Sequence, residues 1–222
     1  SVNQNGNGGS VNAASGNETD SMAANVTCTA GNAPGTTASN TNLNSARTFL
    51  NTSSQYFTCT DVYDFAGADF SLEAWIRPSG TLTGVNRVFI AKGNDGNNAR
   101  QYVFRVNNAK LEFAASPGGT TAYTVAQSDT SLSAGTWYHV AATYDNNTAG
   151  TPDAVTVYID GLKRVSAAPD ITLGNDTDPF IIGAQTASAN YFTGDIDEVA
   201  VYNVALTPEA ISDHRGNIRK IR

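Results

Sequence analysis

The chain is poor in charged residues, and positive charge is the scarcer sign. Asp, Glu, Lys and Arg make up 15 % of its 222 residues, and 13 Lys and Arg against 20 Asp and Glu give a formal net charge of −7 at pH 7. A chain of this kind has no basic stripe for holding phosphates. It also has no apolar run long enough to span a bilayer. We therefore expect neither nucleic acid nor insertion into a membrane.

Cysteine and histidine are scarce as well, with two residues of each: Cys28, Cys59, His139 and His214. No CxxC pair is present, so a zinc site built on cysteine is not expected. An isolated pair of cysteines in a lysine-poor, Asn- and Thr-rich chain indicates a disulfide and an oxidising location. That location is the extracellular space, a cell surface, or the surface of a virion or filament. Two unpaired buried thiols are the alternative.

Long helical patterns are lacking, and short alternating runs take their place. In FSLEAWIRP, residues 70–78, every second side chain from Phe70 to Ile76 is apolar and shares one face of a strand. Similar runs follow at intervals of about 8–12 residues, separated by Gly, Asn, Asp and Pro. Asp160-Gly161 supplies the positive φ that a two-residue hairpin turn requires. The pattern predicts an all-β protein with two antiparallel sheets.

One short helix is predicted near the C-terminus, in VALTPEAISDHR. Thr207 is placed to cap the helix, and Pro208 suits the first helical position because it needs no backbone donor there. Leu206 and Ile211 have the spacing of a hydrophobic staple.

Large apolar side chains are almost absent from the first 20 residues, where only Val2 and Val11 occur. Such a segment buries too little apolar surface to offset its ordering entropy. We expect residues 1–45 to form an extended N-terminal arm and residues 46–222 to form the domain. An arm of this kind also suggests a homo-oligomer or larger assembly in which it docks on a neighbouring subunit.

Eight segments, taken in order, resemble a known family. They are SSQYFTCTD, DFSLEAWIRP, FIAKGND, KLEFAA, LSAGTWYHVAATYD, VTVYIDG, PFIIG and FTGDIDEVAVYNVALTPEAI. From about Ala46 to Asp213 the chain resembles the laminin G-like domains of the concanavalin A-like lectin/glucanase superfamily. The resemblance implies a two-sheet antiparallel jelly roll that is non-enzymatic and serves in binding or adhesion, with a glycan or protein ligand. A structural subunit of a filament, virion or surface layer is the alternative.

The resemblance also implies structural calcium. In calcium-bearing relatives an acid of the last strand holds the ion together with oxygens near the first strand. Asp197 matches the acid and Asn51 the first-strand position, and Asp195 alternates with Asp197. If the last strand is regularly extended, Asp197 shares a face with Val199 and Val201, where an unpaired carboxylate is costly. Backbone amides in place of an ion are the alternative partner.

Catalytic patterns are weak. A glycoside hydrolase on such a sandwich needs two carboxylates across the scissile bond, and the only tightly alternating acids in a strand-like context are Asp195 and Asp197. His139 lies in a strand pattern, where a structural imidazole is the expected role. We predict no catalytic residues and keep glycoside hydrolysis as the less favoured alternative.

Exposed aromatic rings beside polar loops are what a glycan site requires. Tyr63, Tyr191 and Phe192 meet that condition in the sequence, and they are the predicted ligand-binding residues. Packing in the core or on a sheet face is the alternative role for each ring.

Overall fold

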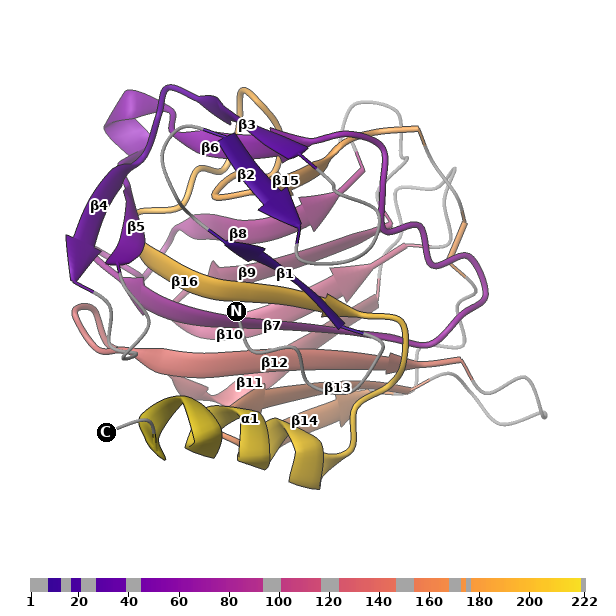
Figure 1. Cartoon of the computed structure of the whole chain (residues 1–222). Helices are drawn as coiled ribbons and strands as arrows, with labels where there is room; N and C mark the ends of the chain where they lie inside the picture. The colour runs from indigo at the N-terminus through magenta and orange to yellow at the C-terminus, as the bar shows by residue number, and fades with distance from the viewer. Residues whose placement is uncertain are drawn as a thin grey trace.

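The protein is described here by a computed structural model. It describes residues 8–12, 17–20, 27–38, 45–93, 101–116, 124–146, 154–167, 173–174 and 177–220. Two antiparallel sheets pack face to face, as the sequence predicts. Figure 1 shows one of them, the front sheet, across the middle of the molecule, and the strands β8 to β11 of the other, the back sheet, behind it.

The front sheet is built around the last strand of the chain. Its order is β1 (Gly8–Asn12), β16 (Gly194–Tyr202), β7 (Phe70–Pro78), β12 (Tyr138–Asp145), β13 (Ala154–Ile159) and β14 (Leu162–Ala167). The first half of β16 also pairs with β5 (Ser45–Phe49), which in turn pairs with β4 (Gly35–Ala38).

The back sheet continues from β1, whose second half leaves β16 and pairs with β2. Its order is β2 (Asn17–Asp20), β3 (Thr27–Gly31), β6 (Tyr56–Cys59), β15 (Phe180–Ile182), β8 (Asn86–Lys92), β9 (Tyr102–Asn107), β10 (Lys110–Ala115) and β11 (Thr124–Ser131). A short 3-10 helix, η1 (Asn51–Ser53), connects β5 to β6.

The core lies between the two sheets and follows the predicted alternation. On β7, Phe70, Leu72, Ala74 and Ile76 are fully buried in one hydrophobic cluster. Each such side chain contributes on the order of 1.5–3 kcal/mol when it leaves water. The opposite face of β7 is buried too, because the segment after β16 crosses it: the Ser71 hydroxyl donates to the Val204 carbonyl at 2.8 Å.

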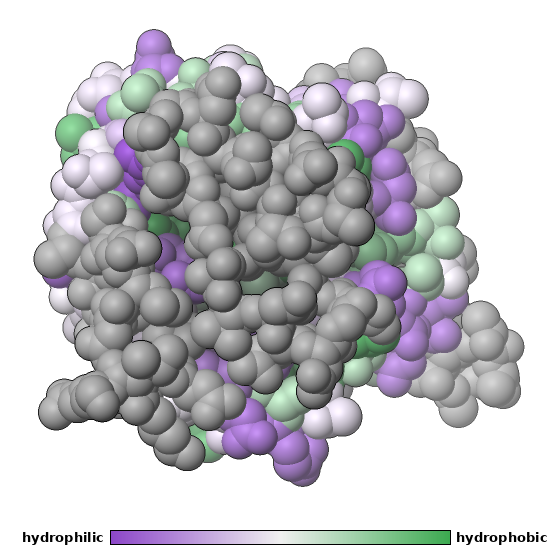
Figure 2. All heavy atoms as spheres, viewed as in Figure 1, coloured by the Kyte–Doolittle hydropathy of each residue, from purple (hydrophilic) through white to green (hydrophobic). Residues whose placement is uncertain are grey.

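The turn and helix predictions are confirmed. Asp160 and Gly161 have φ of 54° and 77° in the β13–β14 hairpin. Helix α1 (Pro208–Lys220) begins as expected, with the Ala210 amide donating to the Thr207 hydroxyl at 3.2 Å. Its apolar side is anchored by Ile211, and Figure 2 shows hydrophilic residues gathered on the lower rim where α1 lies. Among the described residues, no helix is long and apolar enough to cross a membrane.

The predicted disulfide is confirmed. Cys28 on β3 and Cys59 on β6 are directly opposite each other and are bonded. The described strands within residues 1–45 pair with β16, β6 and β5 of the same chain. The remaining residues of that segment lie outside the described ones, and the domain boundary at residue 45 stays a prediction.

Candidate functional site

The acids of β16 do not lie as a regular strand would place them. The pairing of β16 with β7 shifts between Asp197 and Ala200, and Glu198 has a φ of +48°. This bulge puts Ile196 and Val199 on the same core face. The expectation that Asp197 shares the face of Val199 is therefore wrong, because the bulge reverses the alternation. Asp197 Oδ1 instead accepts a hydrogen bond from the Glu198 amide at 3.0 Å.

The more deeply buried acid of this strand is Asp195, which is 5 % exposed. Its Oδ2 accepts from Arg77 Nε and its Oδ1 from the Thr48 hydroxyl, both at 2.7 Å. The Arg77 guanidinium also lies over the ring of Trp137. Asp195 of β16 is thus linked to β7 through the Arg77 guanidinium and to β5 through the Thr48 hydroxyl.

The calcium ligands predicted from the sequence do not converge as a set. Asp195 is engaged by Arg77, and Asn51 lies in η1 beyond the end of β5. Within the described ranges, no group of three or more His, Cys, Asp or Glu side chains is placed to hold a metal ion. Calcium at Asp197 and Asn51 stays a prediction.

A buried polar cluster lies on the outer face of the front sheet, under α1. Glu73 is 3 % exposed, and its Oε2 lies 2.8 Å from His214 Nδ1 of α1. Its Oε1 lies 3.8 Å from His139 Nε2, and His139 is buried beside Trp75. Tyr202 stacks on the His214 ring at 5.6 Å between centroids. The cluster fastens the helix to the sheet.

The pKa values of the two histidines beside Glu73 shift in opposite directions, because burial dominates at His139 and the hydrogen bond with Glu73 dominates at His214. Burial lowers the pKa of His139, although the charge of Glu73 works against that shift. The hydrogen bond with Glu73 raises the pKa of His214. Burial, with the charge of Asp197 beside it, raises the pKa of Glu198 on the neighbouring strand to about 6.

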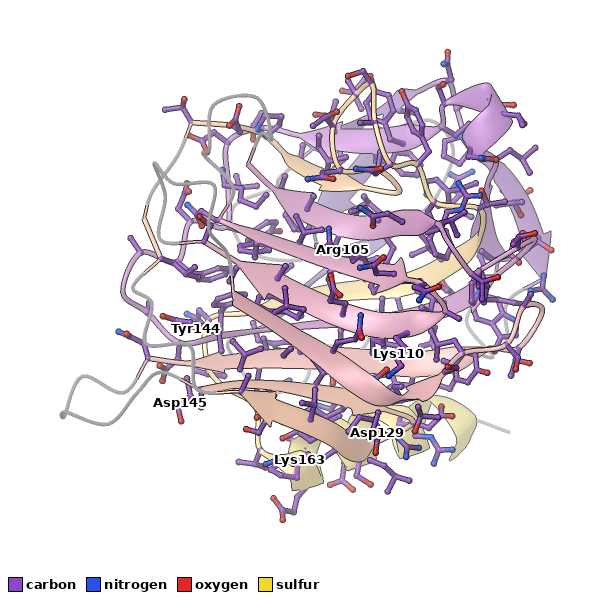
Figure 3. All side chains as sticks on the ribbon, turned by 180° about the vertical axis from the view of Figure 1, so that it is seen from behind. Arg105, Lys110, Asp129, Tyr144, Asp145 and Lys163 are labelled. Atoms are coloured by element: carbon purple, nitrogen blue, oxygen red, sulfur yellow. A yellow bond between two sulfur atoms is a disulfide. The ribbon has the colours of Figure 1, made fainter. Side chains whose placement is uncertain are left out.

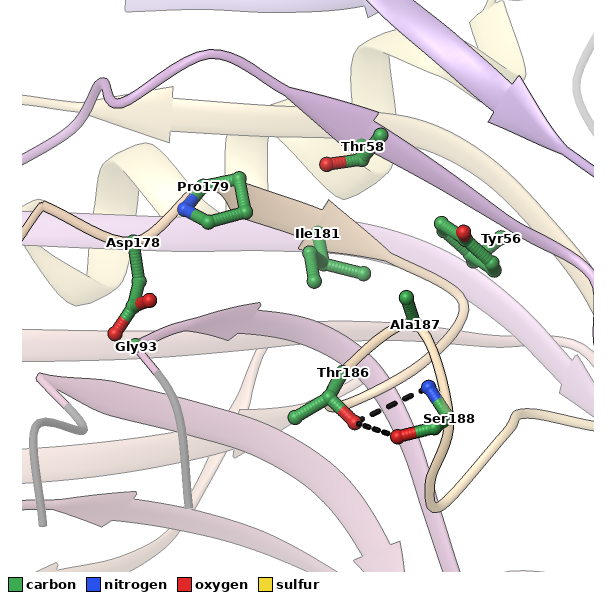
Figure 4. A pocket seen from close by; sticks show the side chains of 9 residues that line it. All are labelled: Tyr56, Thr58, Gly93, Asp178, Pro179, Ile181, Thr186, Ala187 and Ser188. Atoms are coloured by element: carbon green, nitrogen blue, oxygen red, sulfur yellow. Dashed lines mark hydrogen bonds between the residues drawn. The ribbon is translucent and has the colours of Figure 1, made fainter. Parts of the chain in front are cut away.

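A pocket of about 320 Å³ lies on the outer face of the back sheet. Phe57 and Cys59 face the core, so Tyr56 and Thr58 of β6 point outward, as does Ile181 of β15. The lining residues are Tyr56, Thr58, Gly93, Asp178, Pro179, Ile181, Thr186, Ala187 and Ser188. Figure 4 shows the Tyr56 ring at one end, the Asp178 carboxylate at the other and Ile181 between them.

The loop that closes one side of the pocket is held by its own hydrogen bonds. The Thr186 hydroxyl accepts from the Ser188 amide at 3.2 Å, and Asn190 Nδ2 donates to Gln185 Oε1 at 2.5 Å. The Tyr191 hydroxyl donates to the Ala187 carbonyl at 2.6 Å. The loop therefore presents its hydroxyl groups in a fixed arrangement.

The acidic end of the pocket is organised by a buried lysine. Lys92 is fully buried at the end of β8, and its Nζ contacts Asp61, Asp64 and the Asp178 carbonyl oxygen. The hydrogen bond from Lys92 lowers the pKa of Asp61. The ammonium thus holds the β6–β7 loop against the segment before β15.

The three aromatic residues predicted from the sequence have different surroundings. Tyr191 lies beside the pocket, with its ring 6.4 Å from that of Tyr56. Tyr63 packs edge-on against the core residue Phe180. Phe192 is fully buried against Phe89, so its prediction as an exposed platform is wrong.

Tyr56 was missed, although SSQYFTCTD contains the signal. Its alternation puts Phe57 inward and Tyr56 outward. The tyrosine lies opposite Gly31 of β3, where an added Cβ would come within 2.2 Å of the Tyr56 ring. The ring therefore depends on the absence of a side chain at Gly31.

A second polar network occupies the same outer face further along the back sheet. Figure 3 shows Arg105 there. Its Nε donates to Glu112 Oε1 at 2.5 Å, while Gln127 Nε2 and Asn107 Nδ2 donate to Glu112 Oε2 at 2.8 and 3.1 Å. Both oxygens of this buried carboxylate are therefore engaged.

The architecture defines the chain as a two-sheet antiparallel jelly roll. It belongs to the laminin G-like family of the concanavalin A-like lectin/glucanases superfamily, whose sequence model matches residues 51–212. No curated protein sequence matches it.

Several solved structures share the fold. The binding domain of Paraclostridial Mosquitocidal Protein 1 superposes with a TM-score of 0.75 at 14 % identity, over 96 % of this chain and 53 % of that one. The binding domain of botulinum neurotoxin DC, in complex with rat synaptotagmin II, gives 0.71 at 13 % identity, over 94 % and 51 %. The chain thus spans about half of these toxin binding domains.

A third structure is matched over most of both chains. Domain 4 of AbnA, a GH43 extracellular arabinanase from Geobacillus stearothermophilus, was solved with arabinotriose. It gives a TM-score of 0.66 at 20 % identity, over 88 % of this chain and 91 % of that one. At these identities the three likenesses show a shared fold.

Proposed function

We propose that the chain is a non-enzymatic binding module, displayed outside the cell or on a particle surface, that holds a glycan in the pocket beside Tyr56. The observation that supports this proposal is the combination in one pocket of an aromatic ring, an apolar floor and several fixed hydroxyl groups. Sugars present both an apolar face and a ring of hydroxyls, and such a lining matches both. The arabinotriose bound to the AbnA domain lends further support.

The carboxylates support binding rather than hydrolysis. A retaining glycosidase needs two carboxyl groups about 5–5.5 Å apart. Asp178 is the only acid among the residues that line the pocket, and all of those residues are described. Glu112 and Asp195 each have an arginine partner. Glycoside hydrolysis is therefore the less favoured alternative.

A structural subunit remains the main rival. In that case residues 1–45 dock on a neighbouring copy, and the strand that β1 adds to β16 comes from another chain. In the structure described above, β1 pairs with β16 of its own chain. A protein ligand, bound in adhesion, is the second alternative for the pocket.

Two substitutions test the pocket. Tyr56→Ala removes the ring, and Gly31→Ala displaces it without touching the pocket itself. A stacking contact is worth about 1 kcal/mol, so each change should weaken glycan binding about fivefold. Tyr56→Phe keeps the ring and is the matched control.

Binding would be screened on a glycan array and quantified by calorimetry with the strongest ligand, with arabinotriose included. Equal affinity of Tyr56→Ala and wild type would place the glycan elsewhere. A silent array would contradict the glycan ligand itself.

A further inference from the structure

Tyr191 is fixed to the back sheet through the backbone around it. It forms a parallel bridge with Val88 of β8, whose amide donates to the carbonyl of the preceding residue, Asn190, at 3.1 Å. The amide of the following residue, Phe192, donates to the Gly183 carbonyl at 2.8 Å, and the Phe192 ring is fully buried. The position of Tyr191 is therefore set by contacts of both of its neighbours in the chain.

From this position the Tyr191 side chain reaches two residues that line the pocket. Its ring centroid lies 6.4 Å from that of Tyr56, which is within the range of an aromatic pair. Its hydroxyl donates to the Ala187 carbonyl at 2.6 Å. Figure 4 shows Tyr56 and Ala187 at the same end of the pocket, one from β6 and the other from the loop after β15. Tyr191 is not one of the nine lining residues, so it influences the pocket through these two neighbours.

The hydrogen bond to Ala187 fastens the exposed tip of that loop. The bond from the Ser188 amide to the Thr186 hydroxyl, at 3.2 Å, stays within the tip. The Tyr191 hydroxyl instead connects the tip to the segment that the back sheet holds. A loop that already has its bound shape loses less conformational entropy when a ligand arrives.

We propose that Tyr191 is a positioning residue of the glycan pocket, which holds Tyr56 and Ala187 in place before the glycan binds. The proposal rests on the proposed function and adds a residue outside the lining that sets its affinity. Loss of this bond should weaken binding mainly through a less favourable binding entropy, because the loop must then be ordered by the glycan.

Tyr191→Phe isolates the bond, because it removes the hydroxyl and keeps the ring beside Tyr56. Ala187 is exposed, so water can hydrate the freed carbonyl and the variant should melt close to wild type. Tyr138→Phe is the matched control. It removes the same atom from β12 of the front sheet, where the Tyr138 hydroxyl accepts from the Ser133 amide at 2.9 Å.

Calorimetry of the full chain with arabinotriose, xylotriose, mannotriose, cellotriose and N-acetylchitotriose identifies the tightest trisaccharide, which is then titrated into the variants. Tyr191→Phe should bind it about fivefold more weakly, which corresponds to about 1 kcal/mol. Tyr138→Phe should stay within about twofold of wild type.

Hydrogen exchange of the free proteins measures the loop itself. The Ser188 amide donates to the Thr186 hydroxyl and the Ala189 amide donates to the Thr186 carbonyl at 3.4 Å. Both amides should exchange faster in Tyr191→Phe than in wild type, and at the wild-type rate in Tyr138→Phe.

The possible results separate this inference from the proposed function. Wild-type affinity in Tyr191→Phe, together with weaker binding in Tyr56→Ala, overturns the positioning role and leaves the pocket as the glycan site. Weaker binding of Tyr191→Phe without faster exchange also overturns it, because the hydroxyl would then act on the glycan directly. No binding of any probe by wild type contradicts the proposed function and this inference with it.

Discussion

Protonated His214 is expected to hold α1 against the front sheet, so its contribution to stability should fall as the pH rises. The imidazole lies 2.8 Å from Glu73, a buried carboxylate that α1 and the sheet enclose between them. His214→Gln keeps a hydrogen-bonding side chain and removes the charge. The comparison of the two proteins across pH therefore isolates the ion pair.

The direction in which the pKa of His214 shifts decides how its contribution to stability changes with pH. The pKa of His214 is raised by its hydrogen bond with Glu73, so its stabilisation is fully present below the unfolded value of 6.5. It is lost as the pH rises through the higher folded pKa. His139 has a lowered pKa because of burial, so it destabilises the fold as the pH falls below 6.5. Burial raises the pKa of Glu198 from 4.5 to about 6, which is also below the pH range of 6.5 to 9 in which the two proteins are compared.

Other titratable groups face the same cluster. Asp213 and Arg215 belong to α1, Asp160 belongs to the β13–β14 turn, and Tyr202 belongs to β16. Burial raises the pKa of Tyr202, so it stays neutral through the window. Among His139, His214 and Tyr202, therefore, His214 is the residue whose charge changes above pH 6.5.

The stabilisation by the pair of His214 and Glu73 can be estimated from its geometry. A hydrogen bond to a charged, buried partner contributes about 1.5–3 kcal/mol, and the partial exposure of His214 favours the lower end. For a chain of this length about 1.5 kcal/mol corresponds to about 3–6 °C in melting temperature. Wild type should exceed His214→Gln by this amount near pH 6.5, and the gap should close toward pH 9.

Thermal melting by circular dichroism from pH 6.5 to 9 provides the assay. Arg215→Gln is the control, because Arg215 lies on the same helix and contacts Asp160 at 3.6 Å. A gap between wild type and His214→Gln that stays constant over this range would refute the ion pair. A difference in melting temperature that grows with pH would mean that the neutral imidazole of His214 stabilises the fold more than the protonated one.

Three further predictions concern the acids of β16 and the N-terminal segment. Asp195→Asn should lower the free energy of unfolding by about 1–2 kcal/mol in urea, because Arg77 loses a buried partner but is itself one-third exposed; no change would mean that the pair is neutral. The calcium hypothesis predicts that EDTA lowers the melting temperature of wild type and not of Asp197→Asn, and identical melting with and without EDTA in both proteins contradicts it. Deleting residues 1–45 removes β1 from the second half of β16 and breaks the disulfide of Cys59, so the truncated chain should aggregate or melt earlier than the full chain in size-exclusion and melting experiments. Assembly that is lost while a stable monomer survives would instead favour docking of the arm on a neighbour.

Local signals in the sequence predicted much of the fold. The alternation in residues 70–78 placed Phe70 in the core because the strand is regular and packs on both sides. The hairpin turn at Asp160-Gly161 and the helix cap at Thr207 could be predicted because turns and caps depend on neighbouring residues alone. The disulfide was predictable because the chain has only one pair of cysteines.

The bulge in β16 was not predictable in the same way. Nothing in GDIDEVAVY marks Glu198 for a positive φ, since glutamate rarely adopts it. The distortion lies in the pairing with β7, a strand that is distant in the sequence. The one-residue shift follows Asp197 and brings Val199 to the core face that Ile196 occupies. Asp195 becomes the buried partner of Arg77, and Asp197 turns to the backbone beside it.

The pocket depends both on local sequence patterns and on the pairing of strands that are distant in the sequence. Alternation in β6 was sufficient to turn Tyr56 outward, but an outward tyrosine alone does not make a pocket. The pocket forms because Gly31 leaves room for the Tyr56 ring and because residues 186–188, more than a hundred positions later, close the opposite side. Both conditions depend on the order of strands in the back sheet, where β6 lies between β3 and β15. Of the predicted ligand-binding residues Tyr63, Tyr191 and Phe192, Tyr191 lies beside this pocket, whereas Tyr56 lines it and has neighbours that only the topology reveals.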